Sequence, residues 1–174
     1  KGLKRLEYRG YDSAGIAMLQ LIDFYFPYQN MKLELNIPVI NTVKREVPAD
    51  LETVPFDSSL MITRFKMFLD TLFHYMPNVE LIALNIGNES DVYWGTDTAA
   101  VYRFRTFLDS VQPYAKSLYY NIHGEDLKVG TTICYGGLLD NNMKNVYQQL
   151  NAPHDIISLT YYPLLPGFQV ASPT

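Results

Sequence analysis

The sequence has little cysteine, little tryptophan and no excess of positive charge. Its 174 residues include one cysteine, Cys134, which excludes an internal disulfide and a cysteine-based metal site because each needs more than one thiol. This count leaves the cellular compartment open. The 14 Lys and Arg residues against 18 Asp and Glu residues give a net charge of −4. We therefore expect no general affinity for nucleic acid or for an anionic membrane surface.

Long apolar runs and nucleotide-binding signatures are also missing. No run approaches the roughly 18 apolar residues needed to cross a bilayer, and no signal peptide is visible. Because the sequence begins at Lys1 and not at Met, we expect that further residues precede it. No Gly-x-Gly-x-x-Gly or P-loop follows an apolar run, so no nucleotide or other cofactor is predicted. His74 has no second ligand nearby that would indicate a metal.

The most informative stretch of the sequence is residues 79–89, Val-Glu-Leu-Ile-Ala-Leu-Asn-Ile-Gly-Asn-Glu. Its apolar part has the length and composition of a strand that is buried on both faces, as in a parallel sheet. The strand is followed by an amide and a carboxylate, Asn88 and Glu89. Barrels of alternating strands and helices carry their chemistry at this end of the strand, so Glu89 is the first candidate for a catalytic residue.

Strand-like and helix-like segments alternate through most of the chain. In the helical segments, apolar residues recur at three- and four-residue intervals, and Asp57 or Ser58 and Thr96 or Asp97 can act as N-caps. Pro113 is expected to kink the second helix or to end its regular part. The expected order is strand 32–41, helix 59–76, strand 79–88, helix 97–118, strand 128–135, helix 141–150 and strand 155–162.

This alternation predicts an α/β protein with parallel strands and right-handed crossovers. An open doubly wound sheet and a piece of a (β/α)8 barrel both fit the order of the elements. Polar or aromatic residues at the ends of four strands favour the barrel. These residues are Asn41, Asn88, Glu89, Tyr135, Tyr161 and Tyr162.

Two of these strand ends carry a resemblance to a known group of enzymes. The segments are residues 84–89, Leu-Asn-Ile-Gly-Asn-Glu, and residues 155–163, Asp-Ile-Ile-Ser-Leu-Thr-Tyr-Tyr-Pro. Together they resemble the retaining glycoside hydrolases of the large TIM-barrel clan, with the endo-β-1,4-galactanases (arabinogalactan galactosidases) as the nearest family. Those galactanases have Ser-Tyr-Tyr-Pro where this chain has Thr160 before the tyrosines. The resemblance covers about residues 32–168.

The resemblance implies a partial (β/α)8 barrel, about strands 3 to 6, that acts on an oligosaccharide or polysaccharide. It implies that Glu89 is the general acid/base and that Asn88 bonds the sugar 2-hydroxyl. It places the protein outside the cell or in the periplasm. The remaining substrate-binding candidates are polar and aromatic residues at the strand ends and in the loop after the central strand: Asn41, Trp94, Tyr135, Tyr161 and Tyr162.

The second carboxylate of such a site has no candidate in the sequence. The clan nucleophile ends strand seven, and we expect this chain to stop before that strand, since a closed barrel takes about 250 residues. Glu125 and Asp126 precede a strand, and Asp91 lies too close to Glu89 to face it across a sugar. We therefore expect the chain alone to be inactive on β-linked polysaccharide. If the chain is complete, we also expect a homodimer that covers the open sheet edges, or poor solubility.

The first 17 residues resemble a different family. Residues 1–17, Lys-Gly-Leu-Lys-Arg-Leu-Glu-Tyr-Arg-Gly-Tyr-Asp-Ser-Ala-Gly-Ile-Ala, are similar to a signature of the glutaminase domain of glutamine–fructose-6-phosphate aminotransferase. In that family the nucleophile is an N-terminal cysteine upstream of the signature. We expect a foreign segment at 1–20, with a turn and a short strand, and a barrel domain at 21–174 that begins with an aromatic strand at 21–28. A glutaminase segment and a non-catalytic chimeric or truncated chain remain as alternatives.

Overall fold

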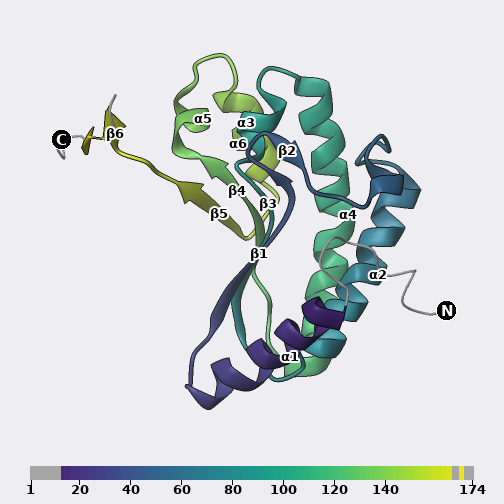
Figure 1. Ribbon diagram of the computed structural model, residues 1–174. Coiled ribbons are helices and arrows are strands. Elements are labelled where there is room, and N and C mark those ends of the chain that lie inside the picture. Colours follow the sequence, from purple (N-terminus) through teal and green to yellow (C-terminus); the bar gives the residue numbers. More distant parts are fainter. Residues whose placement is uncertain (1–12, 166–168, 171–174) are drawn as a thin grey trace.

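The protein is an α/β molecule built on one mainly parallel sheet. The computed structural model describes residues 13–165 and 169–170 (Figure 1). The sheet has the strand order β2-β1-β3-β4-β5. Its parallel strands are β1 (Leu33–Asn41), β3 (Leu81–Asn88), β4 (Val129–Cys134) and β5 (Ile156–Thr160). The two-residue strand β2 (Lys44–Arg45) pairs antiparallel with the end of β1.

Helices connect the parallel strands in the predicted alternation. The connections are α2 (Ser59–Tyr75), α4 (Thr98–His123) and α6 (Lys144–Asn151), which follow β1, β3 and β4 respectively. Two short helices, α3 (Ser90–Trp94) and α5 (Tyr135–Leu139), begin at the carboxyl ends of β3 and β4. A separate two-stranded sheet, β6 (Leu164–Leu165) and β7 (Gln169–Val170), lies away from the body of the molecule (Figure 1).

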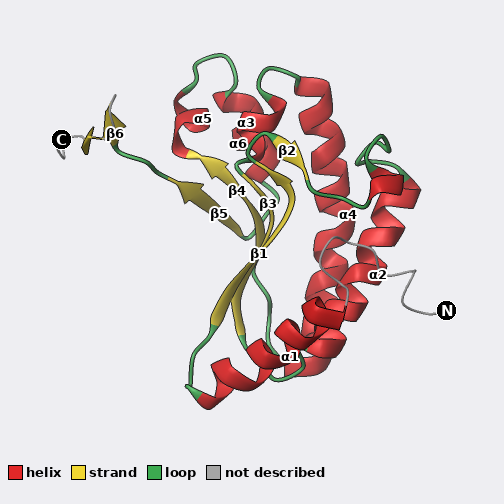
Figure 2. Ribbon diagram, viewed as in Figure 1, coloured by secondary structure: helices red, strands yellow, loops and turns green. Residues whose placement is uncertain are grey.

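One face of the sheet carries the helices and the core. Figure 2 shows α2 and α4 on the same side of the sheet. Along β1, Ile37 and Val39 are buried, whereas Glu34, Asn36 and Pro38 are exposed. This alternation follows from the two-residue period of a strand, and it assigns the exposed set to the face without helices.

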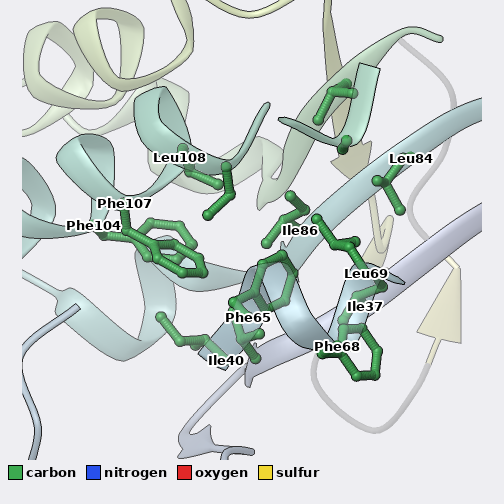
Figure 3. Packing of buried hydrophobic residues seen from close by; sticks show 14 of the residues in the cluster. Ile37, Ile40, Phe65, Phe68, Leu69, Leu84, Ile86, Phe104, Phe107 and Leu108 are labelled. Atoms are coloured by element: carbon green, nitrogen blue, oxygen red, sulfur yellow. The ribbon is translucent and has the colours of Figure 1, made fainter. Parts of the chain in front are cut away.

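The core is unusually rich in phenylalanine. Phe65 on α2 meets Phe107 on α4 edge to face, with ring centroids 5.1 Å apart, and Phe104 stacks on Phe107 at 5.9 Å (Figure 3). Leu84 and Ile86 of β3 are both fully buried in the same cluster (Figure 3). β3 is therefore held by apolar contacts with α2 and α4. This packing fixes the position of Glu89, which follows Asn88 at the end of the strand.

Helix boundaries agree with the predicted caps. The Ser58 side chain accepts a hydrogen bond from the Met61 N–H at 3.1 Å, and Asp97 accepts one from the Ala100 N–H at 2.9 Å. Each bond satisfies an amide that the first helical turn leaves without a partner. Pro113 does not end the helix, because α4 continues to His123; the predicted kink stays a prediction. Buried Val111 and Ala115 pack on either side of the proline and outweigh the lost backbone hydrogen bond.

The predicted aromatic strand at 21–28 was wrong, as was the short strand before it. Residues Ser13–Tyr28 form one helix, α1, and the proposed division at residue 20 falls inside it. Leu19, Ile22 and Phe26 pack against the core at helical spacing. Because further aromatic residues lie between these positions, the sequence read as an aromatic strand and the helical spacing was missed. Residues 1–12 of the aminotransferase-like segment lie outside the described residues.

An aspartate ties α1 to the start of the central strand. Asp23 Oδ1 accepts hydrogen bonds from the backbone N–H groups of Asn78 and Val79, at 2.7 and 3.0 Å. Its Oδ2 accepts from the Asn78 side-chain amide at 2.7 Å. Three donors thus converge on one carboxylate, which anchors the helix to the amino edge of the sheet. None of the described helices is long and apolar enough to cross a membrane.

Candidate functional site

Glu89 lies directly after β3, at the carboxyl edge of the sheet. Its backbone is left-handed, with φ 49° and ψ 43°, and its side chain is only 6% exposed. Oε2 accepts a hydrogen bond from the Thr42 hydroxyl at 2.7 Å. Thr42 also has a positive φ, of 55°. Non-glycine residues adopt this conformation at a cost of about 1 kcal/mol or more, and such strain gathers at functional sites.

Residues from the ends of the other parallel strands surround this carboxylate. Thr42 follows β1, Cys134 ends β4 and Thr160 ends β5. Hydrogen bonding from Thr42 is the main cause that lowers the pKa of Glu89 below its usual value, and burial opposes it. Thr160, Tyr162 and Cys134 lower this pKa further. The second carboxylate oxygen, Oε1, is buried without a hydrogen-bond partner among the described residues.

The lowered pKa bears on the predicted role of Glu89. A general acid must hold a proton near neutral pH, which requires a raised pKa. Glu89 is instead ionised, and its charge raises the pKa of the Tyr162 hydroxyl. The geometry therefore favours an anionic role, as a nucleophile, a base or a partner for developing positive charge. It does not favour the acid half of the predicted acid/base role.

Asp91, which we set aside in the sequence for its closeness to Glu89, is a second buried carboxyl group at this edge. Burial is the main cause that raises its pKa, and the charge of Glu89 adds to the effect. Its Oδ1 accepts the Cys134 backbone N–H at 2.8 Å. A Cβ atom at Gly137 would lie 2.3 Å from its Oδ2. Asp91 is thus enclosed against α5 and positions the end of β4. Gly137 is the sequence signal that could have indicated this close approach.

The predicted substrate-binding residues separate into two groups. Asn88 donates its side-chain amide to Asn41 Oδ1 at 3.0 Å, which joins the ends of β3 and β1. Tyr135 and Tyr161 meet edge to face with centroids 5.3 Å apart. They and Tyr162 are exposed, by 41%, 64% and 66% respectively. All five residues lie at the ends of the parallel strands or just beyond them.

Trp94 does not belong to this group. It ends α3, and its ring lies edge to face with Phe56, with centroids 5.8 Å apart. It also contacts the ring of Phe104 at 5.9 Å. Its indole Nε1 is buried without a partner among the described residues. The single turn of α3 directs the indole back toward α4, so Trp94 packs partly buried against the core, and its contact with a sugar stays a prediction.

A separate hollow lies at the opposite edge of the sheet. It has a volume of about 720 Å³ and lies between α1 and the end of α2, with Phe24, Tyr28 and His74 in its walls. The carboxylate of Asp23 in this wall is already satisfied by the three donors from Asn78 and Val79. Chemistry in parallel α/β proteins gathers at the carboxyl edge, so we place the functional site at Glu89.

Substitution of Thr42 provides a direct test of what holds Glu89 ionised. Thr42→Val keeps the shape of the side chain but removes the hydroxyl that bonds Oε2 at 2.7 Å, so the pKa of Glu89 should rise. A hydrogen bond to a charged group contributes about 1.5–3 kcal/mol, and the variant should lose a comparable amount of unfolding free energy at neutral pH. NMR titration of the Glu89 carboxyl carbon measures the pKa.

Thr42→Ser is the matched control, because it keeps the hydroxyl. It should leave the pKa of Glu89 near the wild-type value. The sign of the pH dependence follows from the lowered pKa. The contribution of Glu89 to stability is present above its unfolded pKa and is lost as the pH falls through its folded pKa. Equal pKa values in the valine and serine variants would contradict the assigned cause.

Within residues 13–165 and 169–170, no group of three or more His, Cys, Asp or Glu side chains could hold a metal ion. The side chains at this edge are the carboxyl groups of Glu89 and Asp91, the Cys134 thiol, amides, hydroxyls and aromatic rings. Comparison of the chain with protein-family models, with curated proteins and with solved structures finds no match.

Proposed function

We propose that the carboxyl edge of the sheet is a saccharide-binding site of the glycosidase type, on a partial (β/α)8 barrel, with Glu89 as its carboxylate. The observation that carries this proposal is the convergence on one buried, ionised carboxylate. Thr42, Cys134 and Thr160, from the ends of the three other parallel strands, all act on Glu89. Loops at this edge of a barrel form the active site.

The chemistry of the edge suits a carbohydrate. Cleavage of a glycosidic bond passes through a transition state that resembles an oxocarbenium ion, which an anionic Glu89 would stabilise or attack. The hydrogen-bonded amides of Asn88 and Asn41 can bond sugar hydroxyls. The exposed rings of Tyr135 and Tyr161 present apolar surfaces together with hydroxyl groups, as a sugar face requires.

The partial barrel is supported by the position of the polar side chains on the open face of the sheet. Glu34 Oε1 accepts from Asn85 at 2.7 Å and from Ser158 at 3.2 Å, and Ser158 also donates to Asn85 Oδ1 at 3.0 Å. Asn36 donates to Thr132 at 3.2 Å. A section of barrel wall would have helices on one face and a layer of hydrogen-bonded polar side chains on the other. In a closed barrel this layer would point inward.

Glycoside cleavage needs a second carboxyl group across the sugar, on the wall opposite the first. Asp91 cannot supply it, since its two oxygens face Cys134 and Gly137. We therefore expect a chain that acts alone to bind saccharide without cleaving it. Cys134 does not offer a nucleophile for the alternative glutaminase function, because burial raises the pKa of its thiol and a nucleophilic cysteine needs a lowered pKa.

The proposal is tested by titration of the protein with β-1,4-linked galacto-oligosaccharides, with calorimetry as the readout. We expect measurable binding that weakens several-fold in Tyr161→Ala and in Glu89→Gln. Glu80→Gln is the control, because Glu80 is an exposed carboxylate in an ion pair with Lys32 at the other edge. Its substitution should leave binding unchanged.

Two outcomes of this titration are informative about different parts of the proposal. Absence of binding, or equal binding by all four proteins, would contradict the saccharide site. Release of reducing sugar that disappears in Glu89→Gln would contradict only the expectation that the lone chain is inactive. In that case a second carboxyl group must reach the site.

A further inference from the structure

The first free edge of the sheet belongs to β1. On its outer side, β1 pairs with β2 only at Ile40 and Asn41, and the Glu46 N–H bonds the Val39 carbonyl. Residues 33–38 have no strand beside them on that side among the described residues. A hollow of about 270 Å³ lies along this edge, with mostly apolar walls that include Leu19, Leu35, Ile37, Phe68 and Leu72.

The second free edge belongs to β5, the last strand of the sheet. Ser158 bonds Asn85 and Glu34 on the open face, so Ile157 and Leu159 point to the helix side by the two-residue period. Both apolar side chains are nevertheless exposed, by 49% and 45%. After β5, the chain leads away from this edge toward β6 (Figure 1). An uncovered edge with exposed apolar residues is a template for pairing with another strand.

We propose that two copies of this chain pair edge to edge, with β5 of each copy beside β1 of the other, and close a parallel barrel. A barrel of about eight strands has an interior that is just wide enough to be filled by side chains. Each copy supplies four parallel strands, β1, β3, β4 and β5. A two-fold axis along the barrel keeps all strands parallel and makes the two junctions identical, so no edge stays open.

The free edges of β5 and β1 match in strand length, and both carry apolar residues on the helix side of the sheet. β5 has 5 residues, and the free part of β1 spans residues 33–38, so one strand covers the other. Ile157 and Leu159 lie on the helix side, as do the walls that Phe68 and Leu72 of α2 contribute to the hollow beside β1. β2 blocks the last part of β1 and would limit the junction there. The polar layer around Glu34 would line the interior from both copies.

This pairing rests on the sheet edges and goes beyond the saccharide site, but it has a consequence for that site. In the closed order, β3 of one copy lies four strands from β3 of the other, on the opposite wall. Glu89 of each copy would then face the same barrel mouth. Glu89 of the second copy would bring a second carboxyl group to that mouth, and because the pKa of Glu89 is lowered in each copy, both would act as anions there.

Sedimentation of the protein without saccharide tests the pairing. We expect a species of twice the 20.0 kDa chain mass, with no larger species at higher concentration. Ile157→Lys places a charge in the junction, and because this side chain is exposed the monomer fold should persist, as circular dichroism can verify. The dimer dissociation constant should rise by at least tenfold. Tyr120→Lys, at an exposed position of α4, is the control and should remain dimeric.

Three results would overturn the pairing. A clean monomer at high concentration would show that a second copy does not cover these edges, which would leave them to further strands of a longer chain. A dimer that persists in Ile157→Lys would place the contact elsewhere. Growth of mass with concentration would show an open, head-to-tail association. A monomer that still binds galacto-oligosaccharides would refute the pairing and leave the saccharide site intact.

Discussion

Gly130→Ala should detach β5 from the sheet and cause one of the largest losses of stability in this protein. A Cβ atom at residue 130 would lie 2.2 Å from the Ile156 carbonyl oxygen and 2.8 Å from Ile156 Cγ1. The first of these atoms belongs to the backbone of the neighbouring strand, with which Gly130 is in register. No side-chain rotation can relieve that contact, so the two strands must separate.

The expected loss in the free energy of unfolding lies at or above the upper end of the about 1–3 kcal/mol typical of overpacking. Urea denaturation followed by circular dichroism measures it. Because β5 carries Thr160 to Glu89, the pKa of Glu89 should rise in the same variant. Gly136→Ala is the matched control, since a Cβ atom there meets nothing within 4 Å. It should be neutral or slightly stabilising, because alanine favours a helix more than glycine does. A similar denaturation midpoint for both variants would refute the steric argument.

Phe107→Ala is expected to remove about 3–5 kcal/mol of stability, which is the typical loss for a buried phenylalanine. Its ring is fully buried and contacts Phe56 at 5.3 Å, Phe65 at 5.1 Å and Phe104 at 5.9 Å. These rings come from three separate segments of the chain. Truncation would leave a cavity between α2 and α4 that their backbones cannot close. Domains of this size are stable by about 5–15 kcal/mol, so the variant should be close to unfolding.

The control for this cavity lies on the same helix. Tyr120 on α4 is 56% exposed, so Tyr120→Ala should change stability by no more than about 0.5 kcal/mol. Thermal unfolding of both variants in parallel separates the loss of core packing from any effect on the helix itself. If Tyr120→Ala cost as much as Phe107→Ala, the aromatic cluster would not be the principal support of the central strand.

The order of the four parallel strands and of the three helices α2, α4 and α6 could be predicted because its signals are local, whereas the short elements between and after them were missed. Apolar spacing identified the long helices, Ser58 and Asp97 identified their starts, and the apolar run before Asn88 identified the central strand. Since parallel strands end at one edge, the position of Glu89 at that edge followed as well. Its membership of a glycosidase-type site is still a proposal, as is the partial barrel.

The sequence by itself determined the alternation of strands and helices and the carboxylate at the end of β3, because these depend on residue spacing along the chain. Only the tertiary structure decided that residues 13–28 are a helix, since packing of Leu19, Ile22 and Phe26 on the core settles an ambiguous apolar run. It also decided that the pKa of Glu89 is lowered, because the hydroxyls that lower it come from segments distant in sequence. Contacts between residues that are far apart in the sequence produce no periodic pattern along it, so they cannot be predicted from residue spacing.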